Sequence, residues 1–112
     1  MKPPGPEEME AAIGRLAERL AAWGATKVIL HGSVARGDFS ATSDIDLIIV
    51  KDTPERVPRR IAEALDRCVE AAAPLSVEPL VYTPAEFERL LADENPLITE
   101  AVRHGRVLLD ET

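Results

Sequence analysis

Cysteine, aromatic residues and positive charge are all scarce in this sequence, and each scarcity excludes a class of protein. Cys68 is the single cysteine among 112 residues, which rules out an intramolecular disulfide framework and favours a reducing compartment, the cytoplasm. Aromatic residues make up only 4%, so a core must consist of aliphatic side chains. The formal net charge of −7 lacks the basic footprint of proteins that bind long nucleic acid. A nucleoside triphosphate remains compatible with this charge, because bound divalent cations offset local acidity.

Long hydrophobic runs and targeting signals are also lacking. The longest apolar run lies within residues 45–50, which is far too short to span a membrane. Residues 1–10 contain one lysine followed by prolines and acids, a pattern unlike a signal peptide. The length suits one domain with one modest core. We therefore expect a flexible N-terminal tail over residues 1–6, a single domain over residues 7–112, and no membrane association.

Apolar spacing and capping residues predict helices and strands along the whole chain. Residues 7–23 have the three- and four-residue apolar steps of an amphipathic helix, which Gly24 ends. The predicted strands are residues 26–30, 44–50, 75–82 and 106–109, and the further helices are residues 53–73, 83–91 and 95–104. This order predicts an α/β (α+β) domain with a small mixed sheet. The first two strands are joined without a crossover helix, so we expect them to be antiparallel.

Three of these elements carry more specific expectations. The strand at 44–50 is apolar on both faces after Asp46, so it should be central in the sheet. Pro79 removes a backbone donor from the strand at 75–82, which favours an edge position. Thr53-Pro54 has the composition of a helix start, and Thr83 with Glu86 forms a capping-box pattern. The apolar stripe expected to pack into the core from the helix after Thr53 is Val57, Ile61, Leu65, Cys68 and Val69.

Asp44 and Asp46 are the first candidates for chemistry. Residues i and i+2 of a strand point to the same face, so the two carboxylates project together while Ile45 points into the core. Like charges held so close repel unless a cation lies between them, and Mg²⁺ favours a few carboxylates combined with phosphate oxygens. An isolated Asp-x-Asp is more often just solvated. Here the apolar run that follows favours a metal-binding pair.

Gly32-Ser33 follows the first strand and is a candidate phosphate-binding turn. Glycine lets the backbone turn tightly and approach a ligand, and backbone N–H groups together with the Ser33 hydroxyl can hold phosphate oxygens. A lone Gly-Ser is usually a simple turn. The combination with Asp44-x-Asp46, ten residues further on, is far more specific. The stretch from His31 to Val50, HGSVARGDFSATSDIDLIIV, closely resembles the motif of DNA polymerase beta-like nucleotidyltransferases, most of all the minimal nucleotidyltransferase (MNT) branch.

The resemblance implies a nucleotidyltransferase core and two-metal nucleotidyl transfer. Gly32 and Ser33 would hold the triphosphate, and Arg36 would neutralise phosphate charge. Asp44 and Asp46 would bind two ions, Mg²⁺ or Mn²⁺, while an acceptor hydroxyl attacks the α-phosphorus and pyrophosphate leaves. The alternative for Arg36 is an exposed loop cation or a salt bridge to Asp38. We assign no catalytic role to His31 or Asp38.

The family also places a third carboxylate on a later strand, where it supports a metal and accepts a proton from the acceptor. The matching residue is Glu78, where the family usually has Asp, so the carboxylate is displaced by about one C–C bond. The alternative is an outward-facing acid that protects an edge strand from aggregation. In that case base catalysis would be weak or absent. Cys68, on a helix stripe, is expected to be a packing residue rather than a nucleophile.

The resemblance further implies a partner. MNT proteins are commonly antitoxins that transfer AMP from ATP to a tyrosine of a helical HEPN-type toxin. A chain this small has little surface for positioning an acceptor, which favours a partner that supplies it. Two other hypotheses remain: transfer to a small molecule such as an aminoglycoside, and a non-catalytic nucleotide-binding module that neutralises a partner by binding.

Overall fold

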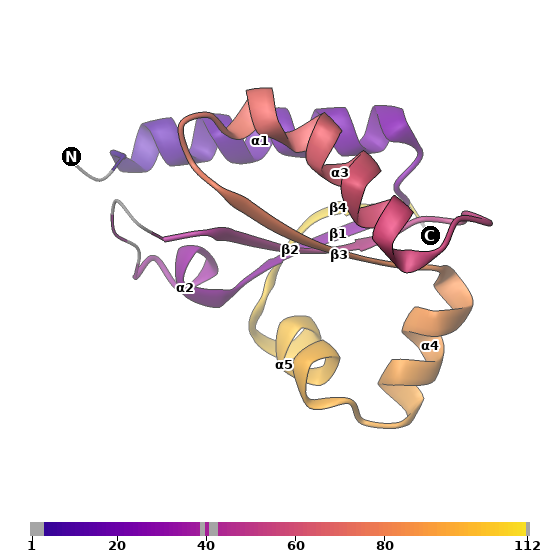
Figure 1. The fold of residues 1–112 in the computed structure, drawn as a ribbon. Helices are drawn as coiled ribbons and strands as arrows, with labels where there is room; N and C mark the ends of the chain where they lie inside the picture. Colours follow the sequence, from indigo (N-terminus) through magenta and orange to yellow (C-terminus); the bar gives the residue numbers. More distant parts are fainter. Residues whose placement is uncertain (1–3, 39, 41–42, 112) are drawn as a thin grey trace.

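A four-stranded sheet lies between two layers of helices in the computed structural model of the chain (Figure 1). The structure describes residues 4–38, 40 and 43–111, so half of the expected tail, residues 1–3, lies outside the described residues. The elements are α1 (Pro6–Trp23), β1 (Lys27–His31), α2 (Gly32–Ala35), β2 (Ile45–Val50), α3 (Val57–Ala72), β3 (Val77–Tyr82), α4 (Pro84–Ala92), α5 (Pro96–His104) and β4 (Arg106–Asp110). The expected α/β class with a small mixed sheet is confirmed.

The sheet has the strand order β3-β2-β1-β4. β1 pairs antiparallel with both β2 and β4, whereas β2 and β3 are parallel. The predictions of an antiparallel first pair, a central β2 and an edge position for the strand with Pro79 are therefore confirmed. Every residue of β2 except Asp46 is buried. A central strand that is covered on both faces holds its first residues in a fixed position, and this matters for the site described below.

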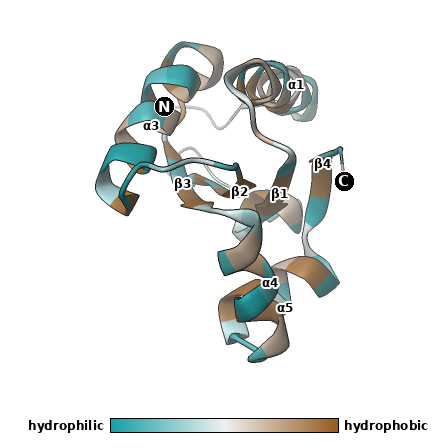
Figure 2. Cartoon of the chain, turned by 90° about the vertical axis from the view of Figure 1, so that its right-hand side faces the viewer, coloured by the Kyte–Doolittle hydropathy of each residue, from teal (hydrophilic) through white to brown (hydrophobic). Residues whose placement is uncertain are grey.

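Each face of the sheet has its own core. Leu47 and Ile49 pack beneath α1 and α3, together with Val28 and Leu30 of β1. Ile48 and Val50 point the other way and pack with Phe87 of α4 and with Ile98 and Ala101 of α5. Figure 2 shows the hydrophobic strands enclosed between these two helix layers. No helix among the described residues has the length and apolarity needed to cross a membrane.

Local chemistry sets most of the helix ends. Gly24 ends α1 with φ of 111°, and its N–H reaches the carbonyls of Ala21 and Leu20. The Thr83 hydroxyl accepts from the Glu86 N–H and the Glu86 carboxylate accepts from the Thr83 N–H, so the predicted capping box is present. The Asn95 side chain accepts from the Ile98 N–H at the start of α5, as Asn95-Pro96 predicts.

The helix α3 departs from both of its predictions. It begins at Val57 rather than at Thr53-Pro54, and the Thr53 hydroxyl instead accepts from the Glu55 N–H within a preceding turn. The predicted core stripe was wrong for three of its five residues, whereas Cys68 is fully buried and Ile61 is half-buried. Val57, Leu65 and Val69 are 48%, 39% and 64% exposed. The buried face consists of Arg60, Ala64, Cys68, Ala71 and Ala72. The three alanines and Cys68 are small and let α3 pack closely against α1 and the sheet, which turns the larger aliphatic side chains outward.

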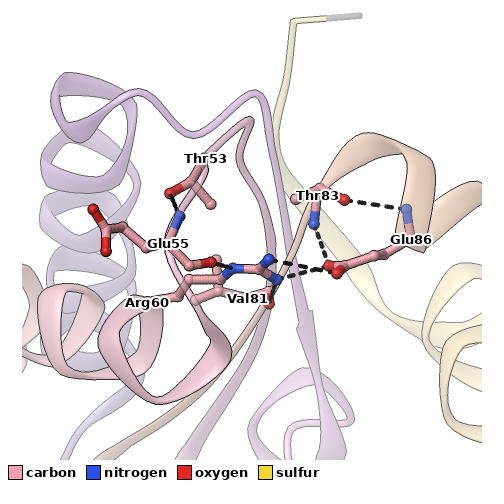
Figure 3. Close-up of polar contacts among 6 residues, drawn as sticks. All are labelled: Thr53, Glu55, Arg60, Val81, Thr83 and Glu86. Atoms are coloured by element: carbon pink, nitrogen blue, oxygen red, sulfur yellow. Dashed lines mark hydrogen bonds and ion pairs between the residues drawn. The ribbon is translucent and has the colours of Figure 1, made fainter.

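Arg60 fills the one charged position on that buried face (Figure 3). Its guanidinium donates to the Glu55 carbonyl at 2.7 Å, to the Val81 carbonyl at 3.4 Å and to the Glu86 carboxylate at 2.7 Å. Burying a charge is tolerated when every donor finds a partner of this kind. Arg60 thereby ties the start of α3, the end of β3 and the start of α4 together.

Candidate functional site

The three candidate carboxylates lie on one face at one end of the sheet. Asp44 precedes β2, Asp46 is the second residue of β2, and Glu78 is the direct partner of Asp46 on β3. The Ile45 N–H donates to the Ser76 carbonyl at 2.9 Å, so the pairing of β2 with β3 begins directly after Asp44. Ile45 itself is fully buried on the opposite face, as the alternation predicts. The acids share the face that α4 and α5 cover further along the strands, but they lie beyond that core.

The carboxylates interact with one another. The pKa of Glu78 is raised above its ordinary value, first by the negative charge of Asp44 and then by that of Asp46. Lesser contributions in the same direction come from desolvation and from side-chain hydrogen bonds with both aspartates. A raised pKa means that the ionised form of Glu78 is unfavourable beside two acids. The cluster is thus a place where added positive charge relieves repulsion.

The Gly32-Ser33 turn lies against this cluster. β1 ends at His31, and Gly32 opens the single turn of α2 with φ of +77°. A Cβ at Gly32 would collide with the Asp46 carboxylate oxygen Oδ2 and would lie 3.3 Å from Asp46 Cγ. Glycine is needed here for both reasons, the left-handed backbone and the close approach. The structure therefore brings together the turn and the Asp pair, which the sequence only places ten residues apart.

Arg36 and His31 flank the turn. Arg36 is exposed and forms no ion pair with any residue that the structure describes, so the alternative of a salt bridge to Asp38 is not formed, whereas that of an exposed loop cation fits. His31 lies opposite Asp46 across the β1–β2 ladder, and burial lowers its pKa while the Asp46 charge opposes that shift. His31, Asp46 and Glu78 thus form one row across three neighbouring strands.

Among the residues that the structure describes, two hollows adjoin α2. One, of about 420 Å³, lies towards α1 and includes Met9, Ile13 and Arg36. The other, of about 200 Å³, lies between α2 and α5. Its α5 wall contains Leu97, Glu100 and His104, which the sequence gave no reason to select. Their i, i+3, i+7 spacing marks one helix face, but only the fold reveals that this face meets Gly32.

The chemistry of the site suits a hard divalent cation. Carboxylate oxygens are the ligands that Mg²⁺ prefers, and Mg²⁺ commonly takes one or two of them and completes its shell with water and substrate phosphates. Among residues 4–38, 40 and 43–111, no group of three His, Cys, Asp or Glu side chains could hold a metal ion by itself. A cation at this site would therefore need further ligands, and the open arrangement of the acids leaves coordination positions for phosphate oxygens.

Comparison with known protein families gives a match over most of the chain. The model of the nucleotidyltransferase domain matches residues 13–108, which include α2, the strands β1, β2 and β3, the start of β4 and every candidate residue. No curated protein matches the chain. Enzymes with this domain transfer nucleotidyl groups from nucleoside triphosphates and generally use divalent metals. The matched segment covers most of the 112 residues, and the chain therefore belongs to the nucleotidyltransferase domain family.

Proposed function

We propose that this chain transfers AMP from ATP to a hydroxyl acceptor, a tyrosine of a HEPN-type partner protein, and so acts as an MNT-type antitoxin. The observation that carries the proposal is the contact of Gly32 with Asp46, which itself pairs with Glu78. This arrangement sets a phosphate-binding turn beside three acids on one sheet face. The full MNT-like motif from His31 to Val50 supports the choice of branch.

The chain's own residues divide the work. Backbone N–H groups at Gly32 and the Ser33 hydroxyl bind the triphosphate tail, and the exposed Arg36 guanidinium offsets its charge. The exposed Glu78 carboxylate accepts the proton of the acceptor hydroxyl, whose oxygen forms the new bond to the α-phosphorus. The bond between the α-phosphorus and the bridging oxygen breaks, and pyrophosphate leaves with that oxygen.

Asp44, Asp46 and Glu78 would hold the divalent cation together with phosphate oxygens of the nucleotide, with two Mg²⁺ ions expected and Mn²⁺ as the other candidate. When bound, such ions polarise the phosphate oxygens and stabilise the leaving pyrophosphate. The mutual repulsion that raises the pKa of Glu78 supports this assignment, since a cation between the carboxylates removes it. Glu78 replaces the usual Asp, and its longer side chain still reaches both aspartates.

The acceptor is proposed to be a protein because the acid cluster is open. Glu78 is exposed at the edge strand β3, so a large partner can approach it from outside the sheet. Positioning contributes most of the catalysis in phosphoryl-type transfer, and a docked partner supplies that positioning. The HEPN identity of the partner rests on the MNT resemblance.

The test is transfer of label from α-labelled ATP with Mg²⁺. The purified chain is incubated with a lysate of its source and compared with an Asp44→Asn/Asp46→Asn variant. We expect one labelled protein band that is absent with the variant, and mass analysis that places AMP on a tyrosine. Label on a small molecule would instead support the small-molecule transferase. No label at all, with nucleotide still bound, would support the non-catalytic module.

A further inference from the structure

The hollow between α2 and α5, here called the α2–α5 pocket, adjoins the phosphate-binding turn on the sheet face that carries the acids. Gly32, Ala35 and Arg36 form one wall, and Leu97, Glu100 and His104 form the other. The pocket measures about 200 Å³. Pockets that hold a whole drug-sized ligand span roughly 300–1,000 Å³, so this one suits a single ring system rather than a complete nucleotide.

The α5 wall presents a face that the core does not use. Ile98 and Ala101 turn into the core beneath the sheet, whereas Leu97, Glu100 and His104 lie on a different side of the helix. Leu97 is 40% exposed, although leucine is normally buried. An exposed apolar side chain beside a carboxylate and an imidazole combines an apolar contact surface with hydrogen-bonding groups.

The position of this wall is fixed by Gly105. A Cβ at that residue would lie 2.8 Å from the Leu30 carbonyl oxygen and 2.8 Å from Ile29 Cγ2, so only glycine lets the end of α5 approach β1 so closely. The Gly105 N–H also donates to the Ala101 carbonyl at 2.8 Å. His104, next to it, is thereby held at the end of β1, where α2 begins.

The charges in the pocket suit a base better than a phosphate. Arg36 lies at the side of the turn, but the Glu100 carboxylate opposes any anion on the α5 side. Carboxylates are good acceptors for the exocyclic amines of bases. Bases are also commonly held between apolar side chains, as Leu97 and Ala35 allow.

We propose that the α2–α5 pocket binds the base of the nucleoside triphosphate, with Leu97 against its face and Glu100 accepting a hydrogen bond from an exocyclic amine, as adenine offers. The inference rests on the proposed function and names the base preference that it leaves open. The triphosphate then extends from the pocket over Gly32 towards the acids, so one ligand spans both features.

Calorimetric titration with Mg²⁺ tests this with three probes: ATP, inosine triphosphate and inorganic tripolyphosphate. Inosine triphosphate has a carbonyl where ATP has the amine, and tripolyphosphate has no base. The wild-type chain should prefer ATP to inosine triphosphate by about tenfold, as expected for a hydrogen bond to a charged group. Glu100→Gln should largely abolish that preference, because an amide can accept from the amine or donate to the carbonyl.

Leu97→Ser should weaken the binding of ATP by about tenfold and leave that of tripolyphosphate unchanged, since the lost packing affects only the base and no charge is added. Val102→Ser is the matched control, because Val102 is 46% exposed on the same helix but does not line the pocket. Thermal melting confirms that all variants fold. The proposal would be overturned if the Leu97 variant lost affinity for ATP and for tripolyphosphate equally, or lost affinity for neither. It would also be overturned if the wild type did not bind ATP. Label transfer is scored separately, so a chain that shows the expected binding pattern but transfers nothing contradicts the proposed function alone.

Discussion

Gly32 has two constraints, its left-handed backbone and its close approach to the Asp46 carboxylate, and substitution by alanine tests both. Gly32→Ala should lower the free energy of unfolding by about 1–2 kcal/mol, because φ is +77°. It should also push the Asp46 carboxylate aside and reduce nucleotidyl transfer by about a hundredfold, the scale of a 1 Å misplacement. Chemical denaturation and transfer of label from α-labelled ATP measure the two effects.

Gly37→Ala is the matched control for this prediction. Its φ is +75°, nearly the same as that of Gly32, but nothing lies within 4 Å of an added Cβ. The backbone cost should therefore be similar while transfer stays near the wild-type rate. If Gly37→Ala impaired transfer as strongly as Gly32→Ala, the contact with Asp46 would not be the cause.

Glu78 gives a pH-dependent prediction that needs no acceptor. The pKa of Glu78 in the folded chain is raised above the ordinary 4.5. Protonated Glu78 therefore adds stability that is fully present below pH 4.5, and this stability is lost as the pH rises through the folded-state pKa. Glu78→Gln should therefore raise the melting temperature at neutral pH in a chelator, and the gain should vanish below pH 4.5. Saturating Mg²⁺ should also shrink it. An unchanged difference across this pH range would contradict the carboxylate cluster.

The residues of the site were partly readable from the sequence. Alternation along a strand predicts that Asp44 and Asp46 share a face, and the buried position of Ile45 bears this out. The pairing of Asp46 with Glu78 depends on the register of two strands that are 32 positions apart, and local pattern does not encode this. Only the family resemblance selected Glu78. Glu100 and His104 had no signal of either kind.

At the scale of elements, α3 offers a comparison between adjacent residues. Val69 is the larger aliphatic side chain, yet it is 64% exposed, whereas the neighbouring Cys68 is fully buried. Cys68 should therefore contribute more to stability than Val69. Val69→Ser should change the free energy of unfolding by no more than about 0.5 kcal/mol. Cys68→Ser buries a hydroxyl in an apolar core and should cost about 1–3 kcal/mol. Urea denaturation measures the two free energies of unfolding. Comparable losses of stability for the two variants would favour the core stripe that the sequence predicted.

The junction of α3, β3 and α4 should respond to acid. The Arg60 hydrogen bond, followed by that of the Thr83 backbone, lowers the pKa of Glu86. The stability it adds is present above pH 4.5 and is lost as the pH falls through the lower, folded-state pKa. Glu86→Gln keeps the capping box but loses the charge, so it should cost about 1 kcal/mol at neutral pH, since the carboxylate is 40% exposed and screened. The deficit should disappear at low pH.

Glu63→Gln serves as the control, because Glu63 pairs with an arginine that is 69% exposed within the same helix. It should change stability little at neutral pH. The contrast also explains which elements the sequence predicted well. Thr83 and Glu86 are three residues apart, and their capping is local chemistry. The buried position of Arg60 depends on Glu86, 26 residues away, so the amphipathic pattern of α3 alone selected the wrong face.

At the scale of the whole molecule, the negative charge of the chain repels the proposed substrate unless a bound cation offsets it. The chain carries −7, three acids gather at one end of the sheet, and the proposed substrate is a polyanion. In a chelator, Asp44→Asn/Asp46→Asn should therefore bind ATP more tightly than the wild type, by about tenfold, because it removes two repelling charges. With Mg²⁺ the order should reverse, since the wild type alone keeps the carboxylates that hold the ion.

The reversal is what separates a metal site from a mere acidic surface. A surface that only repels would give the variant tighter binding under both conditions, with Mg²⁺ screening the difference but never inverting it. Residues that bind phosphate without any metal would give the same affinity for both proteins in both buffers. Titration of ATP into the two proteins, each with chelator and with Mg²⁺, yields four dissociation constants. If Asp44 and Asp46 are ligands of a cation that the nucleotide shares, the variant must bind ATP more tightly in chelator and the wild type more tightly in Mg²⁺.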